Sequence, residues 1–260
     1  MKINVGIAQI PNSADLEKNF SSIMTLLERF KAADVDLVLF PECSLSGFTA
    51  KMKECNLALI KPYLDQIRAW ANQSGIDVVL PTAVAEHGRV YNCGYWFKAG
   101  GSNAFYKIGL TESEKKFFSQ PEIQSPKVFE TKGFRFAVLI CFEAQHEPWA
   151  YFKNGEVDAI LWPGYWGWTP EDQWGSEKEP GKPNLIYSNL AHWRLPILQA
   201  NFAMNDLEGH SGAGPEGLSF VIGPDNLLIG RGPHKQSGGL VVALQKDASV
   251  TTISKCIPLM

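Results

Sequence analysis

Residues 134–143 read FRFAVLICFE, an apolar run rich in aromatic and β-branched side chains that follows Gly133. This composition is typical of a buried strand in the interior of a sheet. The run contains Cys141 near its end, which places a thiol where the strand gives way to a turn. Open α/β sheets carry their ligands and catalytic groups at the carboxyl ends of strands. We therefore predict a strand over this stretch, with Cys141 as a candidate nucleophile.

Two other apolar runs end in charged side chains that suit such a thiol. Residues 37–41, LVLFP, are followed by Glu42, and residues 105–106 are followed by Lys107. A thiol attacks carbon efficiently only as its thiolate, which a neighbouring base or cation promotes. Glu42 is a candidate base, and Lys107 offers a fixed positive charge to a developing oxyanion. Taken singly, each also has an ordinary interpretation: Cys141 as a core residue, Glu42 as a solvated turn residue and Lys107 as an edge lysine.

Strand-like and helical segments alternate along the first third of the chain, which predicts an α/β fold. Apolar residues recur at helical spacing over 16–30 and again over 57–70, where Gly75 stands at the expected C-cap. This rhythm favours crossover units within one domain, residues 1–260. The other predicted elements are strands at 3–10, 37–40, 76–84, 159–162, 196–203, 218–222, 227–230 and a last one at 240–244, a hairpin of 90–98 with 103–107, helices at 148–154 and 185–194, and a long loop over 162–183.

Charge and cysteine usage argue against several classes of protein. The chain of 260 residues has 24 basic and 27 acidic side chains, a net charge of −3, and scattered basic residues. This pattern predicts no nucleic-acid partner and no membrane partner. Five cysteines without a CxxC pair favour reduced thiols in the cytoplasm over disulfides or a zinc cluster. The sequence has no metal-ligand cluster, no phosphate-binding glycine loop after the first strand, no signal peptide and no apolar stretch of about 20 residues, so we expect no cofactor, metal or membrane span.

Three motifs together resemble the nitrilase superfamily of carbon-nitrogen hydrolases. They are FPECSLSGF at 40–48, YKIGL at 106–110 and ICFE at 140–143, and their order and spacing match those of the family. The resemblance implies a four-layer α-β-β-α sandwich, with two sheets face to face and helices outside. It also implies an amidase-like hydrolase of a small amide or N-carbamoyl substrate, and a homodimer or higher homo-oligomer joined through its helical layers.

The motifs also suggest a mechanism. Cys141 attacks the substrate carbon, Glu42 moves protons, and Lys107 stabilises the oxyanion with help from the backbone N–H of Phe142. The expected product is a thioester acyl-enzyme that water hydrolyses. Two alternatives use the same residues or the same fold: a nitrilase that acts on a C≡N bond, and a catalytically silent binding subunit.

Other positions of the motifs bear on the second acid and the pocket. The family often adds a second glutamate after the lysine, and Glu114 fits that pattern best, with Glu112 as its rival. Many relatives carry an arginine four residues after the nucleophile, where this chain has Gln145. We expect Gln145 and the neighbouring His146 to belong to the substrate pocket. Without that arginine, the pocket is expected to prefer a neutral or apolar acyl group.

The loop after residue 161 is unusually aromatic. Five large rings in thirteen residues are rare in a solvated loop, which favours either an aromatic pocket wall or an oligomer contact. The rings are those of Trp162, Tyr165, Trp166, Trp168 and Trp174.

Overall fold

A computed structural model describes the whole chain except residues 123–126, 145–151, 153–154, 168, 171–176, 180–181, 184–193, 208–213 and 249. One sheet contains β1 (Lys2–Gln9), β3 (Leu37–Leu39), β4 (Asp77–Glu86), β5 (Arg89–Lys98), β6 (Gly101–Tyr106), β16 (Gly238–Asp247) and β17 (Val250–Leu259). The other contains β7 (Val128–Thr131), β8 (Phe134–Val138), β9 (Ala159–Pro163), β12 (Ile197–Ala200), β14 (Phe220–Ile222) and β15 (Leu228–Arg231). The smaller elements are β2 (Asn12–Ser13), β10 (Glu177–Glu179), β11 (Lys182–Pro183), β13 (Asn205–Asp206) and the 3₁₀ turns η1 (Ala50–Glu54), η2 (Glu114–Lys116) and η3 (Cys141–Ala144).

Both sheets are mixed. The first runs in the order β17-β16-β1-β3-β4-β5-β6, with β1, β3 and β4 parallel. The second runs in the order β15-β14-β12-β9-β8-β7, with β8, β9 and β12 parallel. Parallel neighbours need crossover connections, and α1 (Leu16–Ala32) and α2 (Leu57–Ser74) supply them in the first sheet. The predicted α/β class and the two crossover helices are therefore confirmed.

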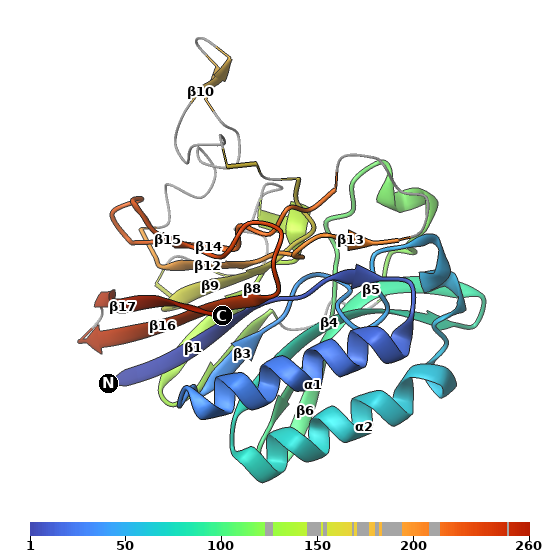
Figure 1. The fold of residues 1–260 in the computed structure, drawn as a ribbon, viewed down its shortest axis with the longest axis horizontal. Coiled ribbons are helices and arrows are strands. Elements are labelled where there is room, and N and C mark those ends of the chain that lie inside the picture. The colour runs from blue at the N-terminus through green and yellow to red at the C-terminus, as the bar shows by residue number, and fades with distance from the viewer. Residues whose placement is uncertain are drawn as a thin grey trace.

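The two helices begin and end where their sequences predict. The Asp15 carboxylate caps α1 by accepting from two backbone N–H groups of its first turn. Gly75 ends α2 with φ of 72°, a left-handed conformation that glycine adopts without steric cost. Both helices pack on one face of the first sheet, where Ile23, Phe30 and Ile67 join its apolar side chains (Figure 1).

The opposite face of the first sheet packs against the second sheet. Ile7 and Val79 from the first sheet share a cluster with Phe136, Leu161 and Leu198 from the second, and all five are fully buried. Alternate residues of a strand point to opposite faces, so the side chains that adjoin these in the strands of the second sheet face away from this interface. The second sheet thus has two apolar faces, as its near-continuous hydrophobic strands predict.

The outward set of the second sheet is also buried. Ala137, Ile160, Ile197 and Ile222 form a separate apolar cluster that includes Phe152. The helices predicted over 148–154 and 185–194 lie largely outside the described residues. Among the described helices, none is long and apolar enough to cross a membrane.

Strands at two sheet edges and inside one predicted loop were not predicted. The strand at 240–244 is not the last, because β17 follows it and pairs along β16. Most side chains of β17 are at least partly exposed, and Pro258 near its end is tolerated on an edge strand, so the hydrophobic pattern that identifies buried strands is absent there. The short edge strand β7 was likewise not predicted, and the loop predicted over 162–183 contains the β10–β11 pair.

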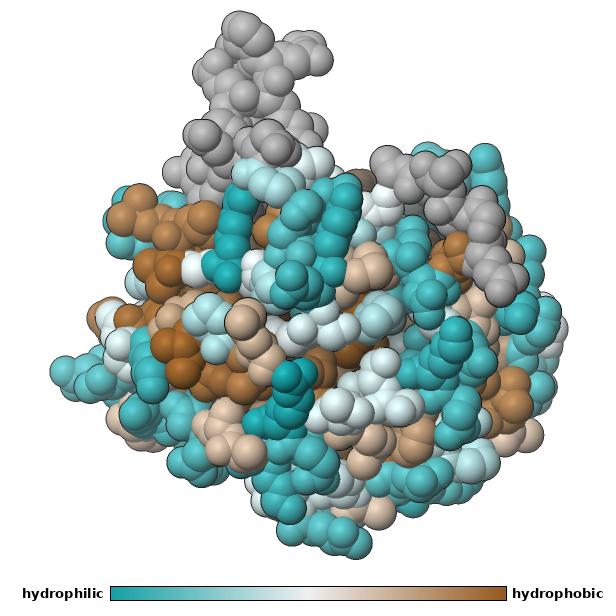
Figure 2. All heavy atoms as spheres, in the orientation of Figure 1, coloured by the Kyte–Doolittle hydropathy of each residue, from teal (hydrophilic) through white to brown (hydrophobic). Residues whose placement is uncertain are grey.

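One edge of the molecule exposes apolar side chains. Figure 2 shows hydrophobic atoms gathered over the β15 end of the second sheet. Leu227, Leu228 and Ile229 contribute to this surface, with exposed fractions of 62%, 39% and 43%. A contiguous exposed apolar surface is typical of a contact site. The homo-oligomer implied by the motif resemblance remains a prediction.

Candidate active site

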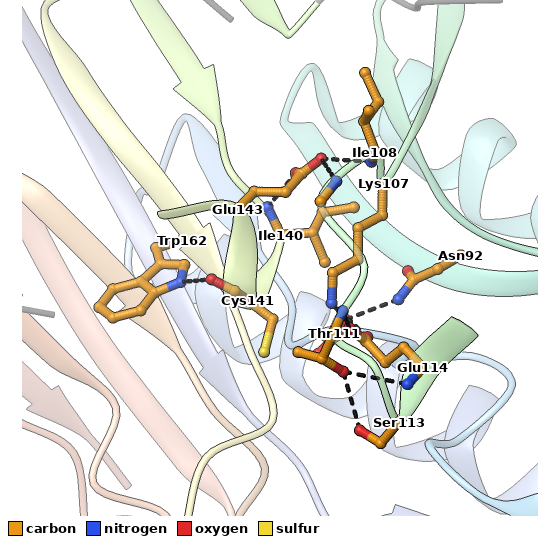
Figure 3. A network of polar contacts seen from close by, with 12 residues as sticks. Asn92, Lys107, Ile108, Thr111, Ser113, Glu114, Ile140, Cys141, Glu143 and Trp162 are labelled. Atoms are coloured by element: carbon orange, nitrogen blue, oxygen red, sulfur yellow. Dashed lines mark hydrogen bonds and ion pairs between the residues drawn. The ribbon is translucent and has the colours of Figure 1, made fainter. Parts of the chain in front are cut away.

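The structure brings Glu42, Lys107 and Cys141 to one place. Glu42 follows β3, Lys107 follows β6, and Cys141 lies just beyond β8. The Lys107 ammonium and the Glu42 carboxylate are 2.7 Å apart, and neither side chain is exposed. The Cys141 side chain points to the region where the lysine chain ends (Figure 3). These three residues come from the three motifs that the sequence singled out.

Lys107 lies between two carboxylates. Its Nζ donates to Glu42 Oε1 at 2.7 Å and to Glu114 Oε1 at 2.5 Å. Glu114 opens the η2 turn, and its Oε2 accepts the backbone N–H of Thr111 at 2.8 Å. The rival Glu112 points away, with its side chain 88% exposed and paired to Lys115. Of the two candidate second glutamates, the structure therefore places Glu114 against the lysine.

Asn92 is a member of the site that sequence reasoning missed. It lies on β5, is almost fully buried, and donates its side-chain amide to Glu42 Oε1 at 2.7 Å. Its backbone carbonyl accepts the N–H of Lys107 at 2.8 Å. Within the described part of the chain, the buried Oε2 of Glu42 has no hydrogen-bond partner. Asn92 and Lys107 thus occupy one oxygen of Glu42 and leave the other available for a proton. A buried polar residue inside an apolar strand was the available sequence signal.

The loop that carries Glu42 is tied to the start of α1. Asn19 donates to the carbonyls of Ser13 and Leu45 at 2.9 and 3.0 Å. Gly47 has φ of 69°, and a Cβ atom there would lie 1.9 Å from the Ser13 carbonyl oxygen. Only glycine permits this approach, which brings the following residue, Phe48, to the wall of the site.

The sequence predicted Cys141 at the end of a strand, and this prediction is wrong. β8 ends at Val138, and Cys141 begins the η3 turn with φ of 50°. A residue other than glycine in the left-handed region costs about 1–3 kcal/mol, and such strain concentrates at functional sites. The Trp162 indole donates to the Cys141 carbonyl at 2.8 Å and helps to hold this conformation.

The electrostatics of the site favour a neutral thiol and a charged lysine. Burial raises the pKa of the Glu42 carboxyl, and Glu114 adds to that rise, whereas Lys107 opposes it. Burial and the charge of Glu42 raise the pKa of the Cys141 thiol, while Lys107 and the backbone N–H of Tyr165 lower it. Burial lowers the pKa of the Lys107 ammonium, but the surrounding acids outweigh burial and leave it raised. Cys141 therefore needs a base at neutral pH, and Glu42 is the carboxylate beside it.

A cavity of about 350 Å³ opens onto these groups. Its described lining consists of Glu42, Phe48, Thr111, Ser113, Glu114, Cys141, Phe142, Tyr165 and Trp166. The rings of Phe48 and Tyr165 stack with centroids 4.8 Å apart and form an aromatic wall. Tyr165 and Trp166, two of the predicted pocket residues, are part of this lining. A larger hollow of about 460 Å³ lies elsewhere, and its described lining contains no cysteine, serine or lysine.

The remaining predicted pocket residues differ in where they lie. Trp162 is fully buried behind the cavity, where its ring meets Trp166 and Phe220 edge-on, so it supports the wall and does not line it. Gln145 and His146 lie outside the described residues, as do Trp168 and Trp174. In the described part of the chain, no three His, Cys, Asp or Glu side chains are grouped to hold a metal ion.

Comparison with known proteins assigns the chain to a family. Residues 4–178 match the family model described as carbon-nitrogen hydrolase. The chain belongs to the carbon-nitrogen hydrolase family. An (R)-stereoselective amidase from Pseudomonas is 31% identical over 117 residues, which are 44% of this chain and 42% of that protein. The aligned region thus spans less than half the length of that relative.

Solved structures show the same fold across nearly the whole chain. An amidase from Nesterenkonia superposes with a TM-score of 0.73 at 20% identity, covering 96% of this chain and 92% of its own. A CN-hydrolase superfamily protein from Xanthomonas campestris gives 0.73 at 17% identity, covering 98% and 91%. A glutamine-dependent NAD+ synthetase from Acinetobacter baumannii gives 0.74 at 22% identity and covers all of this chain but 49% of its own. The nitrilase-type fold inferred from the motifs is thereby confirmed.

Proposed function

We propose that this carbon-nitrogen hydrolase is an amidase that cleaves a non-peptide C–N bond through a thioester on Cys141. The observation that supports this most is the position of the thiol. Cys141 faces a cavity of about 350 Å³ whose lining also includes Glu42 and Glu114, the two carboxylates that hold Lys107. A nucleophile, a base and a fixed cation then converge on one small space, which is the set of groups that acyl transfer requires.

The proposed first half-reaction forms the acyl-enzyme. Glu42 Oε2 accepts the thiol proton as the Cys141 sulfur attacks the carbonyl carbon, whose oxygen takes the negative charge. Lys107 and the backbone N–H of Phe142 stabilise that oxygen. Glu42 then gives the proton to the leaving nitrogen, the C–N bond breaks, and ammonia departs from a primary amide.

The second half-reaction releases the acid. Glu42 takes a proton from water as the water oxygen attacks the thioester carbon. The C–S bond then breaks, and Glu42 returns the proton to the Cys141 sulfur, which leaves the carboxylic acid and the free thiol. Glu114 keeps Lys107 oriented throughout. Two carboxylates and one ammonium give these groups a net charge of −1. Proton transfer from Cys141 to Glu42 preserves that charge, so the buried site never gains a further one.

The proposed substrate is a small amide with a neutral or apolar acyl group. The aromatic wall of Phe48 and Tyr165 offers apolar contact area, and the excess negative charge of the site repels a carboxylate. Lys107, a cation beside the cavity, already has two carboxylate partners. Structures of mutants of the Nesterenkonia amidase hold butyramide and acrylamide, which are amides of this kind.

The decisive experiment measures ammonia release from a panel of substrates, with Cys141→Ala as the control. The panel contains butyramide, amides that carry a terminal carboxylate, ureido acids and nitriles. We expect turnover of butyramide by the parent protein and none by the variant. Turnover of nitriles alone would instead identify a nitrilase, and a well-folded parent that releases no ammonia would identify a silent binding subunit.

A further inference from the structure

Glu143 is a buried carboxylate that the proposed chemistry does not use. It lies two residues after Cys141 in the η3 turn and is fully buried. Its Oε1 accepts the backbone N–H of Ile108 at 2.7 Å, and its Oε2 accepts the backbone N–H of Ile140 at 2.8 Å. Ile108 directly follows Lys107, and Ile140 directly precedes Cys141, so one carboxylate joins the two segments that carry these groups (Figure 3).

The two contacts use opposite oxygens of the same group. A carboxylate accepts hydrogen bonds at both oxygens, whereas an amide accepts at one end and donates at the other. Glutamine at position 143 has the same shape, but its amide nitrogen would face either the Ile108 or the Ile140 N–H, donor against donor. The geometry at Glu143 therefore requires a carboxylate for a reason other than catalysis.

Lys127 supplies the charge that allows this carboxylate to be buried. Its Nζ lies 2.9 Å from both oxygens of Glu143, and both side chains are almost inaccessible. A buried charge without a partner is strongly unfavourable, and the ion pair removes that cost. The Lys127 ammonium also lies near the Phe105 ring, at the end of β6 that leads to Lys107. The pair thus lies where the start of β7 in the second sheet meets the end of β6 in the first.

We propose that Glu143 is a positioning residue that fixes the Lys107 segment relative to the Cys141 segment. It touches neither the substrate cavity nor the thiol in the described contacts. Its effect is to keep the lysine ammonium at the distance where it meets the oxyanion formed at Cys141. This inference rests on the proposed role of Lys107 as the oxyanion stabiliser.

The test compares two variants that differ only at position 143. Lys127→Gln retains the carboxylate and gives it an uncharged donor. Lys127→Gln/Glu143→Gln replaces the ion pair by two neutral amides, so no buried charge is left without a partner. Two probes report separately on the thiol and on the oxyanion site. Iodoacetamide alkylates Cys141 with loss of iodide and forms no oxyanion. Butyraldehyde forms a thiohemiacetal: the S–C bond forms as the C=O double bond becomes a single bond, and the thiol proton moves to the oxygen. That oxygen lies where Lys107 can stabilise it.

Mass spectrometry of the Cys141 peptide follows alkylation, and protection by increasing butyraldehyde gives the dissociation constant of the adduct. We expect the double variant to bind butyraldehyde at least about tenfold more weakly than Lys127→Gln. Alkylation without aldehyde should differ by less than about threefold. Thermal melts confirm that both variants fold. If the double variant does not fold, Glu143→Gln alone replaces it and is compared with the parent protein.

Two results overturn the proposal: equal butyraldehyde affinity in the two variants, or an equal loss of aldehyde affinity and alkylation rate. The second would mean that Glu143 acts on the thiol or on the fold as a whole. Failure of both Glu143 variants to fold would also overturn the proposal, because Glu143 would then serve the fold as a whole. The amidase proposal fails separately, since it falls when the parent protein releases no ammonia from any amide. A parent whose Cys141 gains no protection from butyraldehyde refutes the oxyanion role of Lys107 and, with it, this inference.

Discussion

Replacing Lys107 by methionine removes two effects of its ammonium at once. It neutralises buried carboxylates, and in the proposed mechanism it stabilises the oxyanion. Lys107→Met keeps the length and apolar body of the side chain but leaves Glu42 and Glu114 as a buried pair of like charges. Removing one member of a buried ion pair typically costs about 3–5 kcal/mol of folding stability. Losing one oxyanion donor typically lowers kcat about 10²–10³-fold, or about 2.7–4 kcal/mol.

A second variant distinguishes these contributions. Lys107→Met/Glu114→Gln restores the net charge of −1 that the parent site has, so much of the lost stability should return. Activity should not return, because no cation is left for the oxyanion. Glu114→Gln alone gives the baseline for the loss of that acid. Urea unfolding measures the stability of the three variants, and single-turnover ammonia release from butyramide measures acylation.

The double variant is the decisive one. Its kcat/KM should lie at least about 100-fold below that of Glu114→Gln, even where the two proteins are comparably stable. Activity within about threefold of Glu114→Gln would refute the catalytic role, since Lys107 would then serve only to balance buried charge. A rise in KM with unchanged kcat would likewise place the lysine in substrate binding and not in the transition state.

Three further predictions concern the nucleophile, the base and the pocket. Cys141→Ala should abolish ammonia release yet lose only about 1 kcal/mol of unfolding free energy, as measured in urea, because one small buried group is removed; turnover by a folded variant would exclude the thioester. Burial raises the pKa of the Glu42 carboxyl above its usual 4.5, and the carboxylate is the active form. A pH profile of kcat/KM should therefore fall toward acid with a midpoint above 4.5, and a midpoint at or below that value contradicts Glu42 as the base. Between matched amides with and without a terminal carboxylate, the neutral one should have the higher kcat/KM, and a tenfold preference for the charged one, about 1.4 kcal/mol, would require a cation at the pocket.

Most of the fold could be predicted because its elements have local signatures. The spacings over 16–30 and 57–70 located α1 and α2 to within a few residues, and Gly75 marked the end of the second helix. Buried strands such as β8 were visible as continuous apolar runs. The edge strand β17 was not, because its side chains face solvent and carry no hydrophobic pattern. Its pairing with β16 depends on backbone hydrogen bonds along the sheet edge, which leave no pattern in its side chains.

Part of the candidate site could be predicted from the sequence, and part could not. The motifs singled out Glu42, Lys107 and Cys141 by residue type and by the order of the three motifs, and the catalytic roles of these residues are proposed. They could not decide between Glu114 and Glu112, since a turn of backbone determines which of two nearby acids is buried against the lysine. Asn92 was missed although its place in an apolar strand was visible.

The sequence by itself determined the class of fold and the two crossover helices, and it singled out Glu42, Lys107 and Cys141 as candidates. These follow from periodicity and residue chemistry, which are local. Tertiary structure alone decided that Glu42 has one occupied and one available oxygen, because its partners Asn92 and Lys107 come 50 and 65 residues later. It also decided that Cys141 stands in a left-handed turn and that Glu143 joins two loops. Hydrogen bonds between distant segments depend on how the sheets stack, and no local sequence pattern encodes how close those segments come in the folded chain.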